Sequence, residues 1–335
     1  MGYVAGETIL DDEYIAFVNS SSSPFGINHI MGTGSGNQGL GQSTIGVVNA
    51  GDTITAAQWN ALFTAMDNVA NHTNVSLTST AQRAAGDPVA IVSALVSDIA
   101  SLSTAVAGGS TGALVGGGLT AGSEDSSRVA SAVYDESHVV EESFTFDGGD
   151  EARFFFNAGG KIRVSVSNNA AGSTGRDTAM NAVITALGNF DIGATASTRS
   201  GSGELIVTNG LAKGYFDFTT SYQTLIKLAD DEGTYTSQTI FIQVEAKCGA
   251  GAHADARGNT GNVVTVKVTC SVNDGSSETD YHPQNLDSRP VEDESVGTTD
   301  VSFRTIDPNT SEGLNPVYTN VAVANVSNTT NDSGN

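Results

Sequence analysis

The sequence predicts an α+β, mainly β fold, with an extended N-terminal arm, a short helical, coiled-coil-like segment and a C-terminal antiparallel β-sandwich or jelly-roll-like domain. Three observations support this prediction. The chain of 335 residues has 39 glycines and only 15% charged residues, which favours loops and strands over long charged helices. Its hydrophobic periodicity changes from helical to alternating, and a Gly/Ser-rich stretch separates the two patterns. The predicted parts are an arm (1–50), a helical oligomerisation segment (51–107), a linker (108–127) and one or more β-rich domains (128–335).

The arm shows little periodicity and includes the glycine-rich run Met31–Ser43. Fixing glycine costs more backbone entropy than fixing any other residue, so we expect partners to hold this arm. Gly34, Gly36 and Gly39 match the G-x-G-x-x-G string of dinucleotide-binding sites. Such sites need a strand before the glycines and a helix directly after them, and neither is predicted here, so we interpret the string as a loop.

Two helices are predicted in the helical segment. Thr55 and Gln58 form a capping box at the start of the first, which ends near His72 and has a buried stripe containing the single Trp. The second begins at Asp87, and its apolar residues follow at spacings of three and four, as in the seam of a coiled coil. This seam can pack on its own domain or join chains as an oligomer interface. The interface candidates are Trp59, Leu62, Phe63, Val92, Leu95, Ile99, Leu102 and Val106.

Beyond the linker, alternating apolar residues predict a series of short strands connected by Gly- and Asn-containing turns. One helix, capped by Asp177, interrupts them. Cys248 and Cys270 lie on two long strands of a predicted hairpin, several residues out of register, so we expect free thiols. The predicted strands cover residues 143–147, 152–157, 161–167, 203–208, 214–219, 225–228, 238–247, 262–272, 301–306 and 317–326.

The formal net charge of −23 argues against binding to nucleic acid or to an anionic membrane. There is no run of 18 apolar residues, and the acidic N-terminus lacks the basic start of a signal peptide. The five histidines are scattered and no G-x-S-x-G elbow occurs, so we expect no catalytic residues, no metal site, no cofactor and no enzymatic activity. Residues 230–232 and 292–294 could offer oxygen ligands to Ca²⁺ or be solvated acidic turns.

Sugar binding would require exposed aromatic side chains, and half of the available ones are expected to be core. The candidates are Tyr215, Phe216, Phe218, Tyr222 and Tyr235.

Residues 39–72, GLGQSTIGVVNAGDTITAAQWNALFTAMDNVANH, resemble structural proteins of tailed bacteriophages, especially marine and cyanobacterial ones. In those proteins a Gly-Gln-Ser/Thr segment, a Gly-Asp turn and a Trp-containing helix occur in this order. Residues 154–167, FFFNAGGKIRVSVS, are similar to a strand pair of the same family, and the motif order continues through 258–274. The sequence has no plain terminal knob motif or collagen-like repeat.

The resemblance implies a virion subunit, assembled in the host bacterial cytoplasm, that is a trimeric fibre or a tail or neck accessory protein attached through its N-terminal region. Its expected partners are copies of itself and other virion proteins. A module that binds host-surface glycan, or a capsid decoration protein, is the alternative. The reduced cysteines suit assembly in a bacterial cytoplasm.

Overall fold

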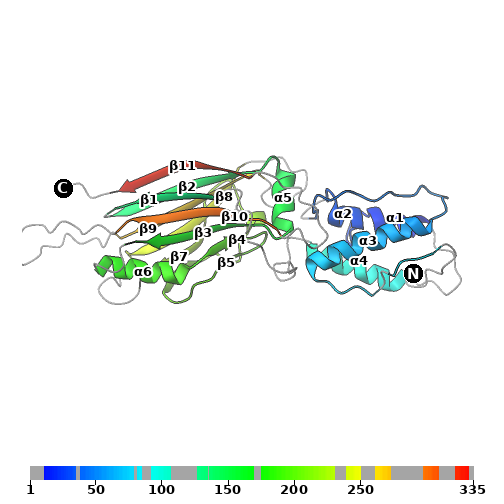
Figure 1. Cartoon of the computed structure of the whole chain (residues 1–335), viewed down its shortest axis with the longest axis horizontal. Coiled ribbons are helices and arrows are strands. Elements are labelled where there is room, and N and C mark those ends of the chain that lie inside the picture. The colour runs from blue at the N-terminus through cyan, green and yellow to red at the C-terminus, as the bar shows by residue number, and fades with distance from the viewer. Residues whose placement is uncertain are drawn as a thin grey trace, which may run out of the picture.

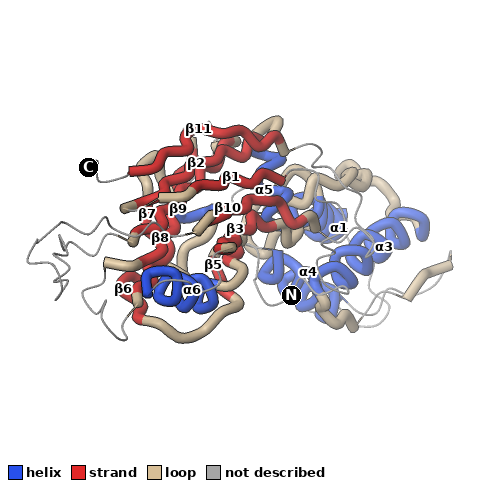
Figure 2. The backbone as a smooth tube through the Cα atoms, turned by 60° about the vertical axis from the view of Figure 1, so that its left-hand side comes forward, coloured by secondary structure: helices blue, strands red, loops and turns tan. Residues whose placement is uncertain are grey.

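The computed structural model is elongated, with a helical domain at one end and a domain of two β-sheets at the other (Figure 1). It describes residues 11–34, 38–78, 81–84, 92–106, 127–134, 136–169, 175–230, 239–249, 261–272, 297–308 and 321–331. Figure 2, turned by 60°, shows the same separation of helices from strands, with one helix lying along the sheets. The predicted class, α+β and mainly β, is confirmed.

Four helices build the helical domain around one apolar core. The capping box predicted at Thr55 is present, with the Thr55 hydroxyl accepting from the Gln58 backbone N–H and the Gln58 side chain accepting from the Thr55 N–H. Trp59 is 4% exposed, and its ring lies 5.3 Å from Tyr14 and 5.8 Å from Phe63. The helices are α1 (Asp11–Asn19), α2 (Ile27–Met31), α3 (Ala56–Thr73) and α4 (Val92–Val106).

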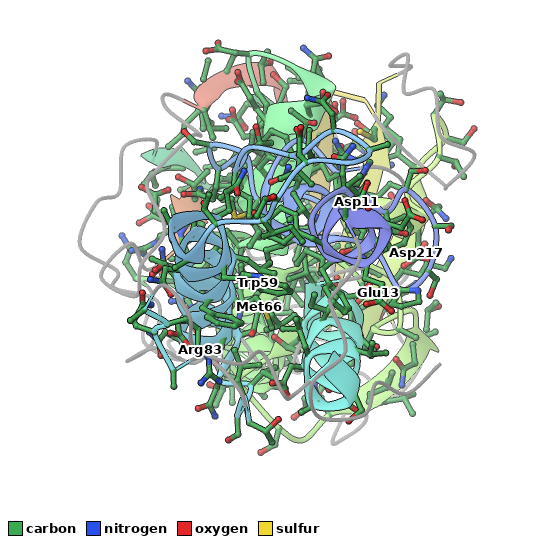
Figure 3. The ribbon with its side chains drawn as sticks, turned by 90° about the vertical axis from the view of Figure 1, so that its right-hand side faces the viewer. Asp11, Glu13, Trp59, Met66, Arg83 and Asp217 are labelled. Carbon is green, nitrogen blue, oxygen red and sulfur yellow. The ribbon has the colours of Figure 1, made fainter. Side chains whose placement is uncertain are left out.

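Much of the predicted arm is folded rather than extended. Helices α1 and α2 pack on α3, and Tyr14, Val18 and Ile30 are fully buried in the same core as Trp59. The apolar periodicity of these segments is too short to reveal the helices, because α1 has nine residues and α2 has five, about two and a half turns and one and a half turns. Figure 3 views the molecule from this end, with Trp59 near the middle of the picture and Asp11 above it.

The β domain consists of two antiparallel sheets whose inner faces share one core. Val140 and Phe144 project into it from the six-stranded sheet, and Val164 and Phe303 from the five-stranded sheet. The five-stranded order is β1 (Ser127–Ala132), β10 (Thr299–Ile306), β3 (Lys161–Asn168), β4 (Phe190–Ile192) and β5 (Ser197–Arg199). The six-stranded order is β11 (Ala322–Asn331), β2 (Ser137–Thr145), β9 (Val263–Ser271), β8 (Phe241–Cys248), β7 (Gln223–Ala229) and β6 (Leu205–Asn209).

Strict alternation sets which side of each strand is buried. In β2 and β8 every second residue is buried, so one side of each strand faces the second sheet and the other side faces outward. The buried side of β8 is apolar, whereas the buried side of β2 also carries His138 and Glu142. The helix predicted at Asp177 is α6 (Gly175–Leu187), which contacts β3 of one sheet and β7 and β8 of the other. Met180, Val183 and Leu187 are fully buried, so α6 contributes apolar side chains to the core that the two sheets share.

The predicted hairpin is confirmed as β8 and β9, with Cys248 opposite Val264 and Cys270 opposite Ile242. Both cysteines are free, as predicted, and both are buried. Two predicted strands are wrong. Residues 152–157 belong to helix α5 (Gly149–Asn157), and residues 214–219 contain the short 3-10 helix η1 (Tyr215–Asp217). In both segments consecutive aromatic residues are buried, and a run that is buried on all sides carries no period to distinguish helix from strand.

Candidate functional site

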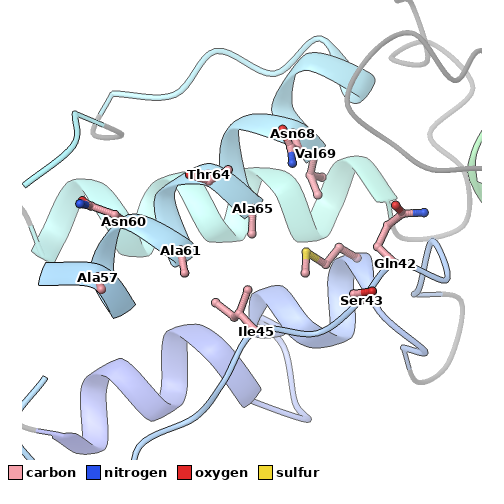
Figure 4. Close-up of a pocket in the computed structure, with 11 residues that line it drawn as sticks. Gln42, Ser43, Ile45, Ala57, Asn60, Ala61, Thr64, Ala65, Asn68 and Val69 are labelled. Carbon is pink, nitrogen blue, oxygen red and sulfur yellow. The ribbon is translucent and has the colours of Figure 1, made fainter. Parts of the chain in front are cut away.

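The helical domain has a groove of about 500 Å³ between α3 and the segment that follows α2. Figure 4 shows Ala61, Ala65 and Val69 projecting from α3 toward Ile45. The lining residues are mostly small. They are Met31, Gln42, Ser43, Ile45, Ala57, Asn60, Ala61, Thr64, Ala65, Asn68 and Val69.

The groove forms because the side chains on this side of α3 are short and hydrogen bonds hold the opposite wall, residues 42–45, away from the helix. Asn28 holds this segment, since its side chain donates to the carbonyl of Ile45 (2.9 Å) and accepts from the Ile45 N–H (2.8 Å). The backbone N–H of Gln42 also donates to the carbonyl of Met31 (2.8 Å). Asn28 is 7% exposed, so both side-chain bonds are shielded from water.

None of the groove-lining residues is acidic, basic, histidine, cysteine or tyrosine. Its polar groups are amides and hydroxyls from Asn60, Asn68, Thr64, Gln42 and Ser43, which donate and accept hydrogen bonds without carrying charge. Apolar walls with a few neutral polar groups are suited to holding an uncharged ligand or chain segment, because no charge is desolvated on binding.

A second candidate region is the joint between the two domains, where helix α5 contacts Thr33 and Gly39 of the glycine-rich segment. Arg153 is 6% exposed and donates to the carbonyl of Thr33 and to Asp150. The Asn157 side chain donates to the carbonyl of Gly39 (2.9 Å). Gly39 has φ +108°, and a Cβ built on it would lie 2.9 Å from the Phe154 ring. Glycine at position 39 therefore allows the backbone to approach α5 closely, which is consistent with the interpretation of the glycine-rich string as a loop.

His72 contributes to the same joint. It is 3% exposed at the last turn of α3, and its Nε2 donates to the carbonyl of Ala158, just beyond α5 (3.1 Å). Burial lowers the pKa of His72, and the bond to Ala158 partly opposes that shift. The ring is therefore neutral at pH 7 and serves as a hydrogen-bond donor between the domains.

The predicted interface residues lie inside one chain's own core. Trp59, Leu62, Phe63, Leu95, Ile99, Leu102 and Val106 are at most 4% exposed and belong to the helical-domain core. Val92 begins α4, and its side chain lies outside the described residues. Of the two interpretations of the seam, packing on its own domain is the one present in this structure. Helices α2 and α3 cover this face of α4.

The other candidates from the sequence are scattered. Tyr215, Phe216 and Phe218 are buried in the β-domain core, Tyr222 lies half-buried under Lys247 and Lys267, and Tyr235 lies outside the described residues. Asp230 is buried, and the rest of both acidic runs lies outside the described residues. No group of three His, Cys, Asp or Glu side chains that could hold a metal ion occurs in the described part of the chain.

The residues that sequence reasoning missed are those that build the groove wall, above all Asn28 and Ile45. Asn28 lies in a five-residue helix, and its partner is 17 residues further along, so no local pattern indicates the contact. The signal that the sequence does carry is the motif order of residues 39–72, because this stretch includes every groove-lining residue except Met31.

Comparison of the chain with protein-family models, with curated proteins and with solved structures gave no match. No helix within the described ranges is both long enough and apolar enough to cross a membrane.

Proposed function

We propose that this chain is a non-enzymatic structural subunit of a tailed-bacteriophage virion, and that the groove of its helical domain attaches it to the particle. The occupant of the groove would be an uncharged segment with small apolar side chains from a neighbouring virion protein. One observation supports this proposal. Residues 39–72, whose motif order resembles that of phage structural proteins, supply all but one of the residues that line the groove.

The joint between the domains supports this role. Buried hydrogen bonds from Asn157 and His72 connect the β domain to the helical domain, so a force applied to one domain is carried to the other. A subunit that projects from a particle would be attached through its helical domain and would expose its β domain.

The first test is location. Antibody raised against the purified chain should label intact particles when they are viewed by electron microscopy, and the position of the label would separate tail, neck and head. Particles that contain no copies of the chain, measured by mass spectrometry after purification, would contradict the proposed function.

The second test is a variant that fills the groove. Ala61→Arg places a long charged side chain at an exposed groove position and should reduce the amount of chain retained in particles about fivefold or more. Ser97→Arg, on an exposed position of α4 outside the groove, adds the same charge and is the matched control. Equal retention of both variants would exclude the groove as the attachment site.

A further inference from the structure

Two ionisable side chains are buried on the inner side of β2, next to the C-terminal strand β11. They are His138 and Glu142, and both are 0% exposed. Strands β1 and β11 contact each other at this edge of the β domain (Figure 1). Glu142 pairs with the guanidinium of Arg128 on β1, so an ion pair connects the two sheets here. His138 instead connects β2 to β11.

The contacts of His138 fit a neutral ring. Its Nε2 lies 2.8 Å from the Oδ1 of Asn328 on β11, so the ring N–H donates to that oxygen. Its Nδ1 is buried and has no hydrogen-bond partner. A proton on Nδ1 would place a second N–H and a positive charge where no acceptor is present, and burying such a group is unfavourable. The closed edge therefore excludes the charged ring.

Neutral groups face His138 from the neighbouring elements. Cys270 on β9 lies directly opposite it, and the ring of Tyr134, which follows β1, lies 5.7 Å from the His138 ring. Burial raises the pKa of Cys270 to about 12 and that of Tyr134 well above its ordinary value, so neither is ionised at pH 7. Asp177 of α6 also acts on Tyr134 through its charge.

The acids near His138 do not compensate for its burial. Asp300 on β10 favours the protonated ring, as does the hydrogen bond to β11, but burial is the larger effect and lowers the pKa of His138 below 6.5. On β2 itself, Glu142 is paired with Arg128. Glu136, which precedes β2, accepts from the side chain of Asn331. A proton on His138 would therefore have no paired carboxylate within the closed structure.

Strand β11 is the element that could move to admit water. It is the last strand of its sheet and pairs only with β2 there, and none of its ten residues is buried. A register shift between Asn325 and Ser327 interrupts the pairing. Few buried contacts and exposed backbone hydrogen bonds are typical of segments that open locally at low cost. The other strands of this sheet that flank the core, β8 and β9, have neighbours on both sides.

We propose that β11 is an acid-released strand, which detaches from β2 when His138 is protonated while the rest of the β domain stays folded. The proton comes from the solvent and binds Nδ1, and the charged ring becomes hydrated where β11 has moved away. Release would uncover the edge of β2 and the apolar side chains beside His138, such as Val140. This inference does not depend on the proposed function.

The direction of the pH effect follows from the two states of His138. With β11 released, the ring has its ordinary pKa of about 6.5, whereas burial lowers the pKa with β11 in place. Release therefore becomes more favourable as the pH falls below about 6.5. Glu142 acts in the opposite sense, because burial raises its pKa and its protonation removes a buried charge. A test must therefore change His138 alone.

Hydrogen exchange in the full chain measures the release. Between pH 7.5 and 5.5, the protection factor of the β11 amides, which corrects for the intrinsic effect of pH, should fall about fivefold or more. The amides of β9 in the same sheet should keep theirs. The variant His138→Gln retains an N–H donor for Asn328 and cannot be protonated, so its β11 protection should not change with pH.

A second variant leaves the core unaltered. Asn328→Asp, at an exposed position, places a carboxylate beside Nε2 that would hold the protonated ring, so β11 should stay protected at pH 5.5. Thr329→Asp is the matched control. Thr329 is also exposed and lies opposite Val139, so it adds the same charge to the outer side of β11 and should keep the pH dependence of the wild type.

Each measurement can contradict the proposal. Unchanged β11 protection at pH 5.5, or an equal loss in β11 and β9, would overturn the release of a single strand. The same pH dependence in His138→Gln as in the wild type would exclude His138 as its cause. If His138→Gln does not fold, the two aspartate variants decide, since equal behaviour of both would also overturn the proposal.

Discussion

The two domains of this chain reach stability in different ways and carry different charge. Residues 1–127 contain ten acidic residues and a single base, Arg83, whereas the other thirteen bases lie in residues 128–335. The helical domain is built from contacts between helices that are close in sequence, and it contains the groove. The β domain is built from strand pairs up to about 190 residues apart, such as β2 with β11. The stability of the helical domain therefore depends on contacts that are more local in sequence than those that hold the β domain together.

The largest expected effect comes from removing one aromatic ring from the β-domain core. Phe156 is fully buried and stacks on Tyr215 with ring centroids 4.5 Å apart. Phe156→Ala should lower the free energy of unfolding of the β domain by about 3–5 kcal/mol, because it removes apolar contacts and leaves a cavity. Far-UV circular dichroism during urea unfolding measures the effect.

Because the chain has a single tryptophan, Phe156→Ala also tests whether the two domains unfold separately. Trp59 lies in the helical-domain core, so its fluorescence reports that domain alone. With Phe156→Ala, the midpoint seen by circular dichroism should fall further than the midpoint seen by fluorescence. Identical shifts of the two midpoints would show that the domains unfold as one cooperative unit, and their stabilities could then not be treated separately.

A smaller effect is expected at the joint. In Gly39→Ala the new Cβ would lie 2.9 Å from both the Phe154 ring and the Thr33 carbonyl, at a backbone φ of +108°. Strain and clash together should cost about 2–3 kcal/mol. The two unfolding transitions should also move apart, because contacts between the domains are lost.

The matched control for the joint is Gly51→Ala. Gly51 has φ +89°, but no atom lies within 4 Å of a Cβ built there, so only the backbone strain of about 1 kcal/mol remains. Urea unfolding of both variants gives the difference directly. If Gly51→Ala proved as destabilising as Gly39→Ala, close packing at the joint would not be the reason for glycine at position 39.

The smallest effect concerns pH and His72. Burial lowers the pKa of His72 below its ordinary value of 6.5 in the folded chain. Below pH 6.5 the unfolded chain therefore takes up a proton that the folded chain does not, and stability decreases as the pH falls from about 6.5 toward the folded pKa. Above about pH 6.5 His72 is neutral in both the folded and the unfolded chain, and this loss of stability is absent.

The variant His72→Gln keeps an N–H donor for the Ala158 carbonyl and removes the titration. Its stability, measured by Trp59 fluorescence in urea, should depend less on pH between 7.5 and about 5 than that of the wild type. Burial also lowers the pKa of His29, which lies in the helical domain, so some dependence on pH should remain. An unchanged slope in His72→Gln would show that His72 does not contribute to it.

Several elements could be predicted from the sequence because their cause is local. Thr55 and Gln58 form a capping box within one turn, and the β8–β9 hairpin follows from two alternating runs separated by a glycine-rich stretch. The candidate site was only partly predictable. The motif order drew attention to residues 39–72, but the opposing wall depends on Asn28, which lies outside that stretch.

The sequence by itself determined the α+β class, the positions of α3, α6 and most strands, and the free state of both cysteines, because periodicity, capping and spacing are properties of neighbouring residues. Only the tertiary structure decided which partner each apolar stripe meets. It placed Leu95, Ile99 and Leu102 against their own chain, and it turned the Phe154–Phe156 run into a helix at the joint. A hydrophobic face contributes the same transfer free energy whether a neighbouring helix or a second copy covers it, so its pattern alone cannot name the partner.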